Sequence, residues 1–200
     1  VLNPIGGSTG TNITVTNGNL TATTPIASVS NFFKIPSSIS VSSGKWYFED
    51  TVTAIDTNNW AISIAGTPPL NDSSNQNGLL SGEVTYVAKN NSSVEQIFDN
   101  GSSTYTGGSG ASAGDVIGVA FDATSLTVQF YRNNTAVSTA QSITSATFFY
   151  ISAIVRNNTT ASTHNINFGQ RPFSYTPPSG FVALNTYNLP ASTVPNGASY

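Results

Sequence analysis

The acidic residues of this chain are the side chains with the most obvious capacity for catalysis. Glu49 and Asp50 are neighbours in a segment with strand-like alternation, so their carboxylates point to opposite faces of a sheet and do not form an acid and base pair. Glu83 and Glu95 could approach each other across a hairpin, but charged residues on strands usually form a solvated face. The sequence therefore gives glycosidase chemistry little support.

The single histidine, His164, has no companion metal ligand in the nearby sequence. Alternation places it on the same face as Ile166 and Phe168, which predicts a packed or rim histidine rather than a catalytic one. The chain has no cysteine and no Gly-x-Ser-x-Gly elbow, so thiolate chemistry and serine hydrolysis also lack support. We therefore expect no enzyme activity, no catalytic residue, no metal and no cofactor.

Positions rich in short amides give better candidates for ligand binding than for catalysis. Asp56, Asn58 and Asn59 precede Trp60, and an aromatic ring beside amides and a carboxylate suits stacking and hydrogen bonding to a saccharide. The alternative is that Trp60 begins a core strand. Further loop residues able to contact a partner are Asn90, Asn91, Tyr105, Arg156, Asn157 and Asn158.

Composition narrows the classes of partner. Charged residues make up 8% of the 200 positions, far below the roughly 25% typical of soluble domains, so Ser, Thr, Asn and Gly must supply solubility. Six Lys and Arg residues with a net charge of −3 cannot neutralise phosphates densely, so we do not expect nucleic acid as a partner. No apolar run approaches the ~20 residues of a membrane span, so we expect no membrane insertion.

Period-two alternation of apolar residues predicts an all-β, antiparallel two-sheet sandwich with very little helix. Residues 45–55 form the longest such segment, with Trp46, Phe48 and Val52 on a packed face and Tyr47 and Glu49 on a wet face. The other predicted strands are 12–15, 20–23, 32–35, 39–41, 60–64, 83–89, 94–98, 116–121, 126–131, 148–155 and 165–168. Residues 100–114 are rich in Gly and Ser and are predicted to be a mobile loop.

Asp50 is the residue that fits this alternation least well. Strict alternation from Phe48 to Val52 aims its carboxylate into the core, where an unpaired charge would cost several kcal/mol. Either a bulge at Glu49 and Asp50 turns the carboxylate outward, or it is buried with a partner such as Arg171 or a hydroxyl. The sequence leaves both alternatives open.

Three sequence blocks follow one another along the chain: residues 43–49 (SGKWYFE), residues 114–122 (GDVIGVAFD) continued by 126–133, and residues 167–181 (NFGQRPFSYTPPSGF). Together they resemble SPRY domains, in the form carried by bacteriophage virion proteins. The likeness spans about residues 3 to 190. It implies two packed antiparallel sheets related to concanavalin-like jelly rolls, with ligand contacts made by loops and no catalytic machinery.

Residues of these blocks are expected to hold the fold together. Gly118 leaves room for a large side chain from the facing sheet. The prolines of residues 167–181 fix the path of that segment and its aromatic rings bury large areas, which predicts a structural clamp rather than a binding site. The predicted structural residues are Trp46, Phe48, Gly118, Phe168, Arg171, Pro172, Phe173, Tyr175, Pro177 and Phe181.

The sequence predicts one domain over residues 1–190, including an N-terminal hairpin at about 12–23, and a linker or contact segment over 191–200. The chain contains no Met and opens at Val1, so we expect a module of a larger protein.

We expect a non-enzymatic binding or structural module of a phage virion protein, in a tail, fibre or capsid. It would be extracellular, exposed on the particle, and would act in host-surface attachment or virion assembly. Its expected partners are other virion subunits or a host cell-surface protein or glycan, with oligomers possible through the parent protein. The alternative is a lectin-like carbohydrate-binding domain of a bacterial surface protein or polysaccharide-active enzyme, and a third hypothesis is an architectural spacer.

Overall fold

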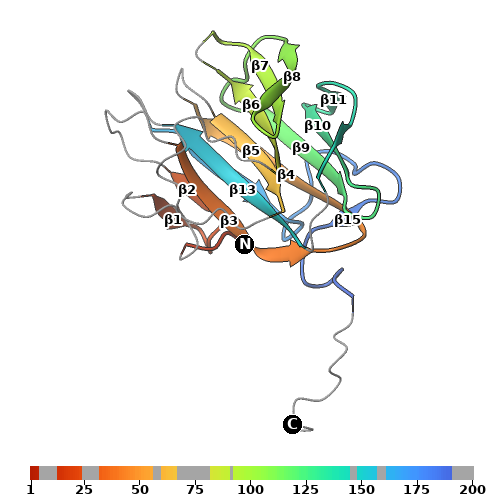
Figure 1. Cartoon of the computed structure of the whole chain (residues 1–200). Helices are drawn as coiled ribbons and strands as arrows, with labels where there is room; N and C mark the ends of the chain where they lie inside the picture. Colours follow the sequence, from red (N-terminus) through yellow and green to blue (C-terminus); the bar gives the residue numbers. More distant parts are fainter. Residues whose placement is uncertain are drawn as a thin grey trace, which may run out of the picture.

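Two sheets pack face to face in the computed structural model, which describes residues 1–4, 13–23, 32–55, 60–66, 82–90, 92–144, 148–156 and 161–190 (Figure 1). The nine-stranded sheet consists, in spatial order, of β1 (Thr14–Thr16), β2 (Thr21–Thr23), β14 (Thr163–Asn167), β4 (Lys45–Ala54), β9 (Val116–Asp122), β10 (Thr127–Arg132) and β11 (Thr135–Ala136), with β12 (Gln141–Ser142) beside β10 and β15 (Val182–Ala183) beside β4.

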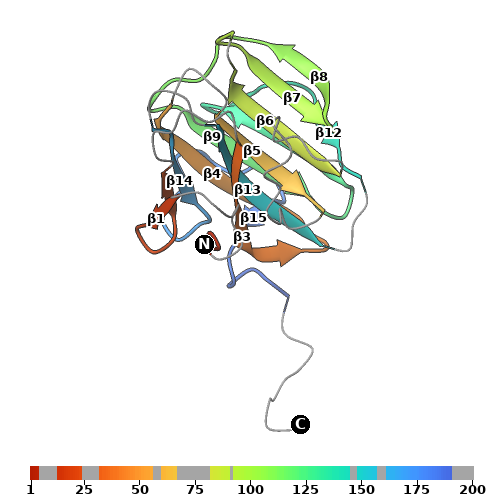
Figure 2. The ribbon, with the colours of Figure 1, turned by 60° about the vertical axis from the view of Figure 1, so that its left-hand side comes forward.

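The second sheet has six strands that follow one another without interruption across its width (Figure 2). They are, in spatial order, β3 (Phe32–Val41), β13 (Phe149–Arg156), β5 (Trp60–Ala65), β6 (Glu83–Lys89), β7 (Glu95–Asp99) and β8 (Ser102–Gly107). All pairings within the two sheets are antiparallel except that of β15 with β4. The described residues contain no helix, so the predicted all-β sandwich is confirmed.

Each predicted strand overlaps an observed one, and the turn residues explain the hairpins. Asn17, Gly18 and Asn19 have positive φ angles between β1 and β2, as the predicted N-terminal hairpin requires. Pro36 lies in β3, at the edge of the six-stranded sheet, where its missing N–H removes no interior hydrogen bond. Asn133 and Asn134, with φ angles of 48° and 65°, turn the chain from β10 into β11.

The prediction of a mobile loop over residues 100–114 is wrong for its first half. Residues 102–107 form β8, which pairs with β7 and is the edge strand of the six-stranded sheet. Asn100 and Gly101 have φ angles of 50° and 79°, the conformation that a tight Asn-Gly hairpin turn needs. Asn100-Gly101 alone predicts a hairpin, but the high Gly and Ser content of residues 100–114 led to the prediction of a loop.

The core between the sheets is rich in aromatic rings. Tyr86 of β6 stacks on Phe130 of β10 at 5.3 Å between ring centroids, and Phe121 meets Phe149 edge-on at 5.1 Å. Both pairs join one sheet to the other. The largest side chains with less than 2% exposure are Trp60, Tyr86, Phe48, Phe121, Phe130, Leu2, Ile62, Ile64, Ile97, Ile117 and Ile166.

Asp50 is buried inside this core, with 0% of its surface exposed. Its Oδ2 lies 2.5 Å from Nδ1 of His164, and its Oδ1 accepts a hydrogen bond of 3.0 Å from the Asn165 backbone N–H. Burial with a partner is therefore the correct alternative, but the partner is His164 rather than Arg171 or a hydroxyl. Arg171 instead donates from Nη2 to the Asn165 side-chain oxygen at 3.1 Å.

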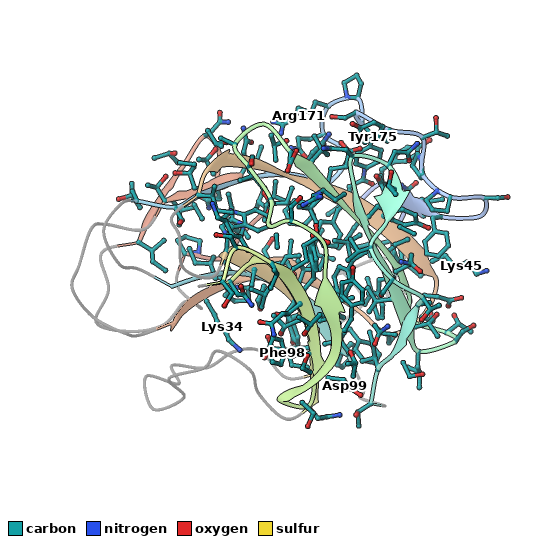
Figure 3. The ribbon with its side chains drawn as sticks, turned by 90° about the horizontal axis from the view of Figure 1, so that it is seen from above. Lys34, Lys45, Phe98, Asp99, Arg171 and Tyr175 are labelled. Carbon is teal, nitrogen blue, oxygen red and sulfur yellow. The ribbon has the colours of Figure 1, made fainter. Side chains whose placement is uncertain are left out.

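The outer face of β4, predicted to be wet, is covered by the segment after β14. Glu49 is 2% exposed: its Oε2 accepts from the Ser174 N–H at 2.8 Å and its Oε1 from the Tyr175 N–H at 2.9 Å. Tyr47 meets Phe173 edge-on at 5.0 Å. The predicted structural clamp thus docks onto this sheet through a buried carboxylate, and Figure 3 shows Arg171 and Tyr175 on the side of the sandwich opposite Lys34 and Phe98.

Gly118 does make room for a large side chain, but not one from the facing sheet. A Cβ on Gly118 would lie 2.6 Å from the hydroxyl of Tyr47, which belongs to the neighbouring strand β4 and points to the outer face. The clamp also has a short ladder of its own, because Val182 and Ala183 pair in parallel with Trp46 and Tyr47. These contacts bury the outer face of β4 at Tyr47 and Glu49, while Lys45 and Thr53 at the two ends of that face stay exposed.

Replacing Asp50 by Ala should lower the free energy of unfolding by about 3 kcal/mol, because it removes the carboxylate that contacts His164 Nδ1 and accepts from the Asn165 N–H in the core. Urea denaturation checks this. The double variant Asp50→Ala/His164→Ala should lose less than the sum of the single losses. Thr53→Ala, at an exposed position of the same strand, is the control and should change stability by less than about 0.5 kcal/mol. An equally small effect of Asp50→Ala would contradict the role given to the pair.

Replacing Glu49 by Ala should release residues 173–175 from the sheet, because two backbone N–H groups lose a charged acceptor. Amide hydrogen exchange at Ser174 and Tyr175 should accelerate, and stability should fall by about 2 to 4 kcal/mol. Glu49→Gln keeps one acceptor oxygen and should therefore preserve protection at one of the two amides while the other exchanges faster. Unchanged exchange in Glu49→Ala would show that the clamp is held by its aromatic rings alone.

Candidate ligand-binding site

The sheet register brings the strand ends that flank the predicted binding loops to one end of the sandwich. Val155, Trp60 and Lys89 are successive cross-strand partners in β13, β5 and β6. In the other sheet Thr163 pairs with Ala54. The Trp60 ring stacks on His164 at 4.1 Å, which places the two sets of strand ends together. We call this the loop end.

Most of the predicted ligand residues stay predictions. Six of them lie outside the described residues, and they are Asp56, Asn58, Asn59, Asn91, Asn157 and Asn158. Arg156 is the last residue of β13, and its side chain also lies outside what the structure describes. The described side chains are those of Trp60, Asn90 and Tyr105.

Trp60 is wholly inside the protein, with 0% exposure, and its ring lies nearly parallel to that of His164. An indole in this position offers no face to a saccharide. The alternative interpretation is therefore correct: Trp60 begins the core strand β5. His164 is likewise a packed histidine, as the sequence predicted.

Asn90 uses its side chain to hold the turn between β6 and β7. Its Oδ1 accepts from the backbone N–H groups of Ser92 at 2.9 Å and Val94 at 3.2 Å, and its Nδ2 donates to Gln96 Oε1 at 2.6 Å. An Asn that closes its own turn in this way is a structural residue. The expected contact of Asn90 with a ligand has no support in this geometry.

Tyr105 lines a polar pocket of about 360 Å³ where the free edges of the two sheets meet beside the loop end. Strand β8 forms one wall, and β10 with β11 forms the other; Figure 1 shows these strands at the same side of the sandwich. We call it the edge pocket. Its lining residues are Glu95, Tyr105, Arg132, Asn133, Thr135, Ala136 and Val137.

Glu95 is the central side chain of the edge pocket. It is 4% exposed, and its Oε1 receives Arg132 Nη1 at 2.6 Å and the Tyr86 hydroxyl at 3.1 Å. Its Oε2 has no hydrogen-bond partner in the described part of the chain and is not sealed from solvent. Burial raises the pKa of Glu95, although Arg132 and the Tyr86 hydroxyl act in the opposite direction.

Other polar groups of the edge pocket differ in how fully they are bonded. Arg132 donates from Nη1 to the Ser109 carbonyl as well as to Glu95, while its Nη2 and Nε bind no described residue. The hydroxyls of Tyr105 and Thr135 also lack a partner within the described ranges. Asn133, in contrast, is occupied: Nδ2 donates to Asp115 at 2.7 Å and Oδ1 accepts from the Val116 N–H.

Glu95 and Arg132 were not predicted to be site residues, and Glu95 was expected on a solvated face. A signal was present in the sequence, because Glu95 is in phase with Ile97 and Arg132 with Phe130, so both charges fall on core-facing positions. The approach of Glu83 to Glu95 that the sequence left possible does not occur, and Glu83 is not on a solvated face either. Glu83 is on the opposite sheet face, where it is buried against Lys34 at 2.6 Å.

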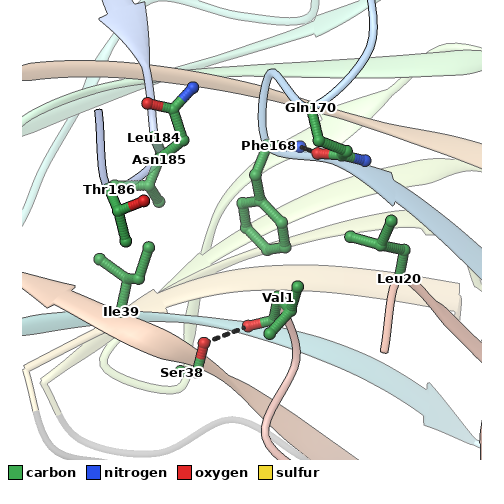
Figure 4. Close-up of a pocket in the computed structure, with 9 residues that line it drawn as sticks. All are labelled: Val1, Leu20, Ser38, Ile39, Phe168, Gln170, Leu184, Asn185 and Thr186. Carbon is green, nitrogen blue, oxygen red and sulfur yellow. Dashed lines mark hydrogen bonds between the residues drawn. The ribbon is translucent and has the colours of Figure 1, made fainter. Parts of the chain in front are cut away.

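A second pocket of about 380 Å³ lies between the N-terminus, β3 and the segment after β14 (Figure 4). Its walls are mainly apolar, from Leu20, Ile39, Phe168 and Leu184. The Ser38 hydroxyl facing it already donates to the Val1 carbonyl at 2.9 Å. Because few free polar groups converge there, the edge pocket is the stronger candidate for specific recognition.

Neither a metal centre nor a membrane helix is found among the residues that the structure describes. No three His, Asp or Glu side chains gather there as a metal site would require. Nor does any helix in the same ranges have the length and apolarity needed to cross a bilayer.

The structure belongs to the class of antiparallel β-sandwich domains. The family model of the SPRY domain matches residues 45–171, more than half of the chain, so the chain belongs to the SPRY domain family. The resemblance found in the sequence is thereby confirmed for the family, and SPRY domains are protein-binding modules. No curated protein matches the chain.

Solved structures agree with this fold. The SPRY domain of human HERC1 is 17% identical, with a TM-score of 0.63 over 86% of this chain and 100% of that chain. The TRIM65 PSpry domain is 10% identical, with a TM-score of 0.63 over 83% and 87%. The carbohydrate-binding module CBM66 from Bacillus subtilis is 12% identical, with a TM-score of 0.50 over 80% and 93%.

The raised pKa of Glu95 predicts a pH dependence of stability. The folded state holds the Glu95 proton at pH values where the unfolded chain has lost it, so stability from this group declines as the pH rises through the raised pKa. Urea denaturation between about pH 4 and pH 7 should show wild type losing free energy of unfolding relative to Glu95→Gln. The opposite slope would mean that the Arg132 contact outweighs burial.

Proposed function

We propose that this SPRY domain is a non-enzymatic binding module of a bacteriophage virion protein, displayed on the particle, where it attaches to a host-surface molecule or to a virion subunit through its loop end. The observation that carries this proposal is the edge pocket, where unbonded hydrogen-bonding groups lie beside the loop end of a protein-binding fold. A chain with 8% charged residues and much Ser, Thr, Asn and Gly also fits exposed viral fibre and capsid modules.

The buried carboxylates support a role without catalysis. Glu49 is bonded to the clamp, Asp50 to His164, Glu83 to Lys34 and Glu95 to Arg132. Each therefore has a structural partner. Glu49 and Glu83 lie on the outer faces of the two sheets, while Asp50 and Glu95 face the core from different sheets. This arrangement lacks the acid and base pair that hydrolysis of a glycosidic bond needs.

A lectin-like, carbohydrate-binding role is the second candidate. It is favoured by the fold shared with the carbohydrate-binding module CBM66 and by a pocket whose lining is more polar than apolar. In this case the partner at the loop end would be a glycan of the host surface. The two candidates agree on the contact surface and differ in the kind of partner.

Soluble domain should compete with intact phage for the host if the proposal is correct. Purified residues 1–200 should reduce adsorption of the parent phage in a dose-dependent manner, and gold-labelled antibody against the domain should decorate intact particles. Thr135→Trp, which fills the mouth of the edge pocket from an exposed position, should weaken competition at least tenfold. Ser102→Trp, exposed at the other end of β8, is the matched control and should compete normally. Unlabelled particles together with absent competition would refute the virion role.

A further inference from the structure

The edge pocket contains the one incompletely bonded carboxylate among the buried glutamates that the structure describes. Glu49 accepts on both oxygens, from the clamp amides and Tyr47, and Glu83 accepts on both, from Lys34 and Thr85. Glu95 accepts only on Oε1. Glu95 lines the pocket, and its Oε2 accepts from no described residue while remaining open to solvent, so a hydroxyl of a ligand in the pocket could donate to it in place of water.

Two glycines keep this region open. A Cβ on Gly108 would lie 2.7 Å from Glu95 Oε2, and a Cβ on Gly107 would lie 2.9 Å from the Tyr105 hydroxyl. Gly108 also has a φ of 62°, which a residue with a side chain adopts only with strain. The chain therefore uses glycine where any side chain would press on the unbonded oxygen or hydroxyl.

The edge pocket holds an unbonded hydrogen-bond acceptor, on Glu95, next to unbonded donors, on Arg132. The contact of 2.6 Å between Arg132 Nη1 and Glu95 Oε1 fixes the guanidinium next to the carboxylate, with Oε2 free to accept and Nη2 and Nε free to donate. Adjacent hydroxyl groups of a saccharide match this pattern, because one can donate to the carboxylate while its neighbour accepts from the guanidinium. The hydroxyls of Tyr105 and Thr135 add further hydrogen-bonding positions.

The charges of the site favour a neutral ligand. Glu95 and Arg132 neutralise each other, so a charged ligand would meet one member of the pair as a like charge in a poorly solvated position. Asp115 adds negative charge near Glu95, which further disfavours an anion. The volume of about 360 Å³ is near the lower end of ligand pockets and suits one or two sugar rings.

We propose that the edge pocket binds a neutral saccharide unit through two neighbouring hydroxyl groups, one donating to Glu95 Oε2 and the other accepting from Arg132, with Tyr105 as the aromatic wall. This ligand class rests on the proposed attachment function of the loop end, which it makes specific. The small side chains of Ala136 and Val137 provide an apolar surface for the C–H face of the sugar.

Glycan binding by the purified domain tests the proposal. Residues 1–200 are applied to an array of neutral, sialylated and sulfated glycans, and each positive neutral sugar is then titrated as its methyl glycoside by NMR. Neutral glycans should bind, with shifts at the amides of Gly107, Gly108 and Thr135. Binding restricted to charged glycans, or no shift with any neutral methyl glycoside at about 10 mM, would overturn the proposal.

Variants separate recognition from folding. Glu95→Gln and Arg132→Lys should each weaken binding at least tenfold, and Tyr105→Phe should weaken it about threefold. Asp99→Asn, which removes a carboxylate from the opposite end of the same strand, is the matched control and should bind as wild type. If Glu95→Gln unfolds, Thr135→Trp at the exposed mouth still blocks the pocket, and full binding by that variant would overturn the proposal.

The glycan-binding and adsorption experiments test the saccharide proposal and the virion role separately. If the domain binds no neutral glycan but still competes with the phage for the host, the saccharide proposal is overturned and attachment to a protein partner remains. Binding of an Asn- or Gln-containing peptide in the edge pocket, with no neutral methyl glycoside bound there, would equally overturn it, because the side-chain amide also sets a donor beside an acceptor. Glycan binding without any adsorption competition would preserve the saccharide site and refute the virion role.

Discussion

Burial of Glu49 and Asp50, on opposite faces of the middle of β4, is the constraint on which the rest of this structure depends. A strand at the centre of the nine-stranded sheet would ordinarily expose one face, yet here Glu49 points outward and Asp50 inward and both are buried. Each carboxylate can be buried only because it receives donors from another segment of the chain. Glu49 fixes the clamp after β14, and Asp50 fixes the start of β14 through His164 and Asn165. Two adjacent residues thereby determine where two distant segments pack.

The fold could be predicted well where alternation and turn chemistry agree, as in the β9 and β10 pair and the Asn-Gly hairpin near the N-terminus. It could not be predicted where a second layer covers a face, because alternation shows that Tyr47 and Glu49 share a face but not what lies over it. Asp50 illustrates the same limit: burial with a partner was one of two open alternatives. Its partner, His164, lies 114 residues away, and only the register of β4 with β14 brings the two together.

The candidate site was predicted less well than the fold, for a physical reason. Polar and aromatic residues of expected loops were the predicted ligand contacts, and Tyr105 combines both properties in one side chain. Glu95 and Arg132 are on strands, at core-facing positions, and they become a site only because the edges of two sheets leave a gap between β8 and β11. The prediction that Trp60 contacts a ligand was wrong. Its neighbours in the sequence are polar, but they do not reveal that the His164 ring stacks on the indole inside the core.

At the edge of the sandwich between β8 and β11, the same side chains close the core and line the edge pocket. Between β8 and β11 no ladder joins the two sheets, and the aromatic pair Tyr86 and Phe130 is followed by the polar group of Tyr86, Glu95 and Arg132. Apolar side chains of similar volume could close such an edge at no cost in stability, because a buried ion pair seldom exceeds well-packed hydrophobic residues in net free energy. The free Oε2 of Glu95 adds no hydrogen bond within the described part of the protein, so it contributes nothing to the closure of this edge. The cluster of Tyr86, Glu95 and Arg132 is therefore better explained by binding of a ligand than by its contribution to packing.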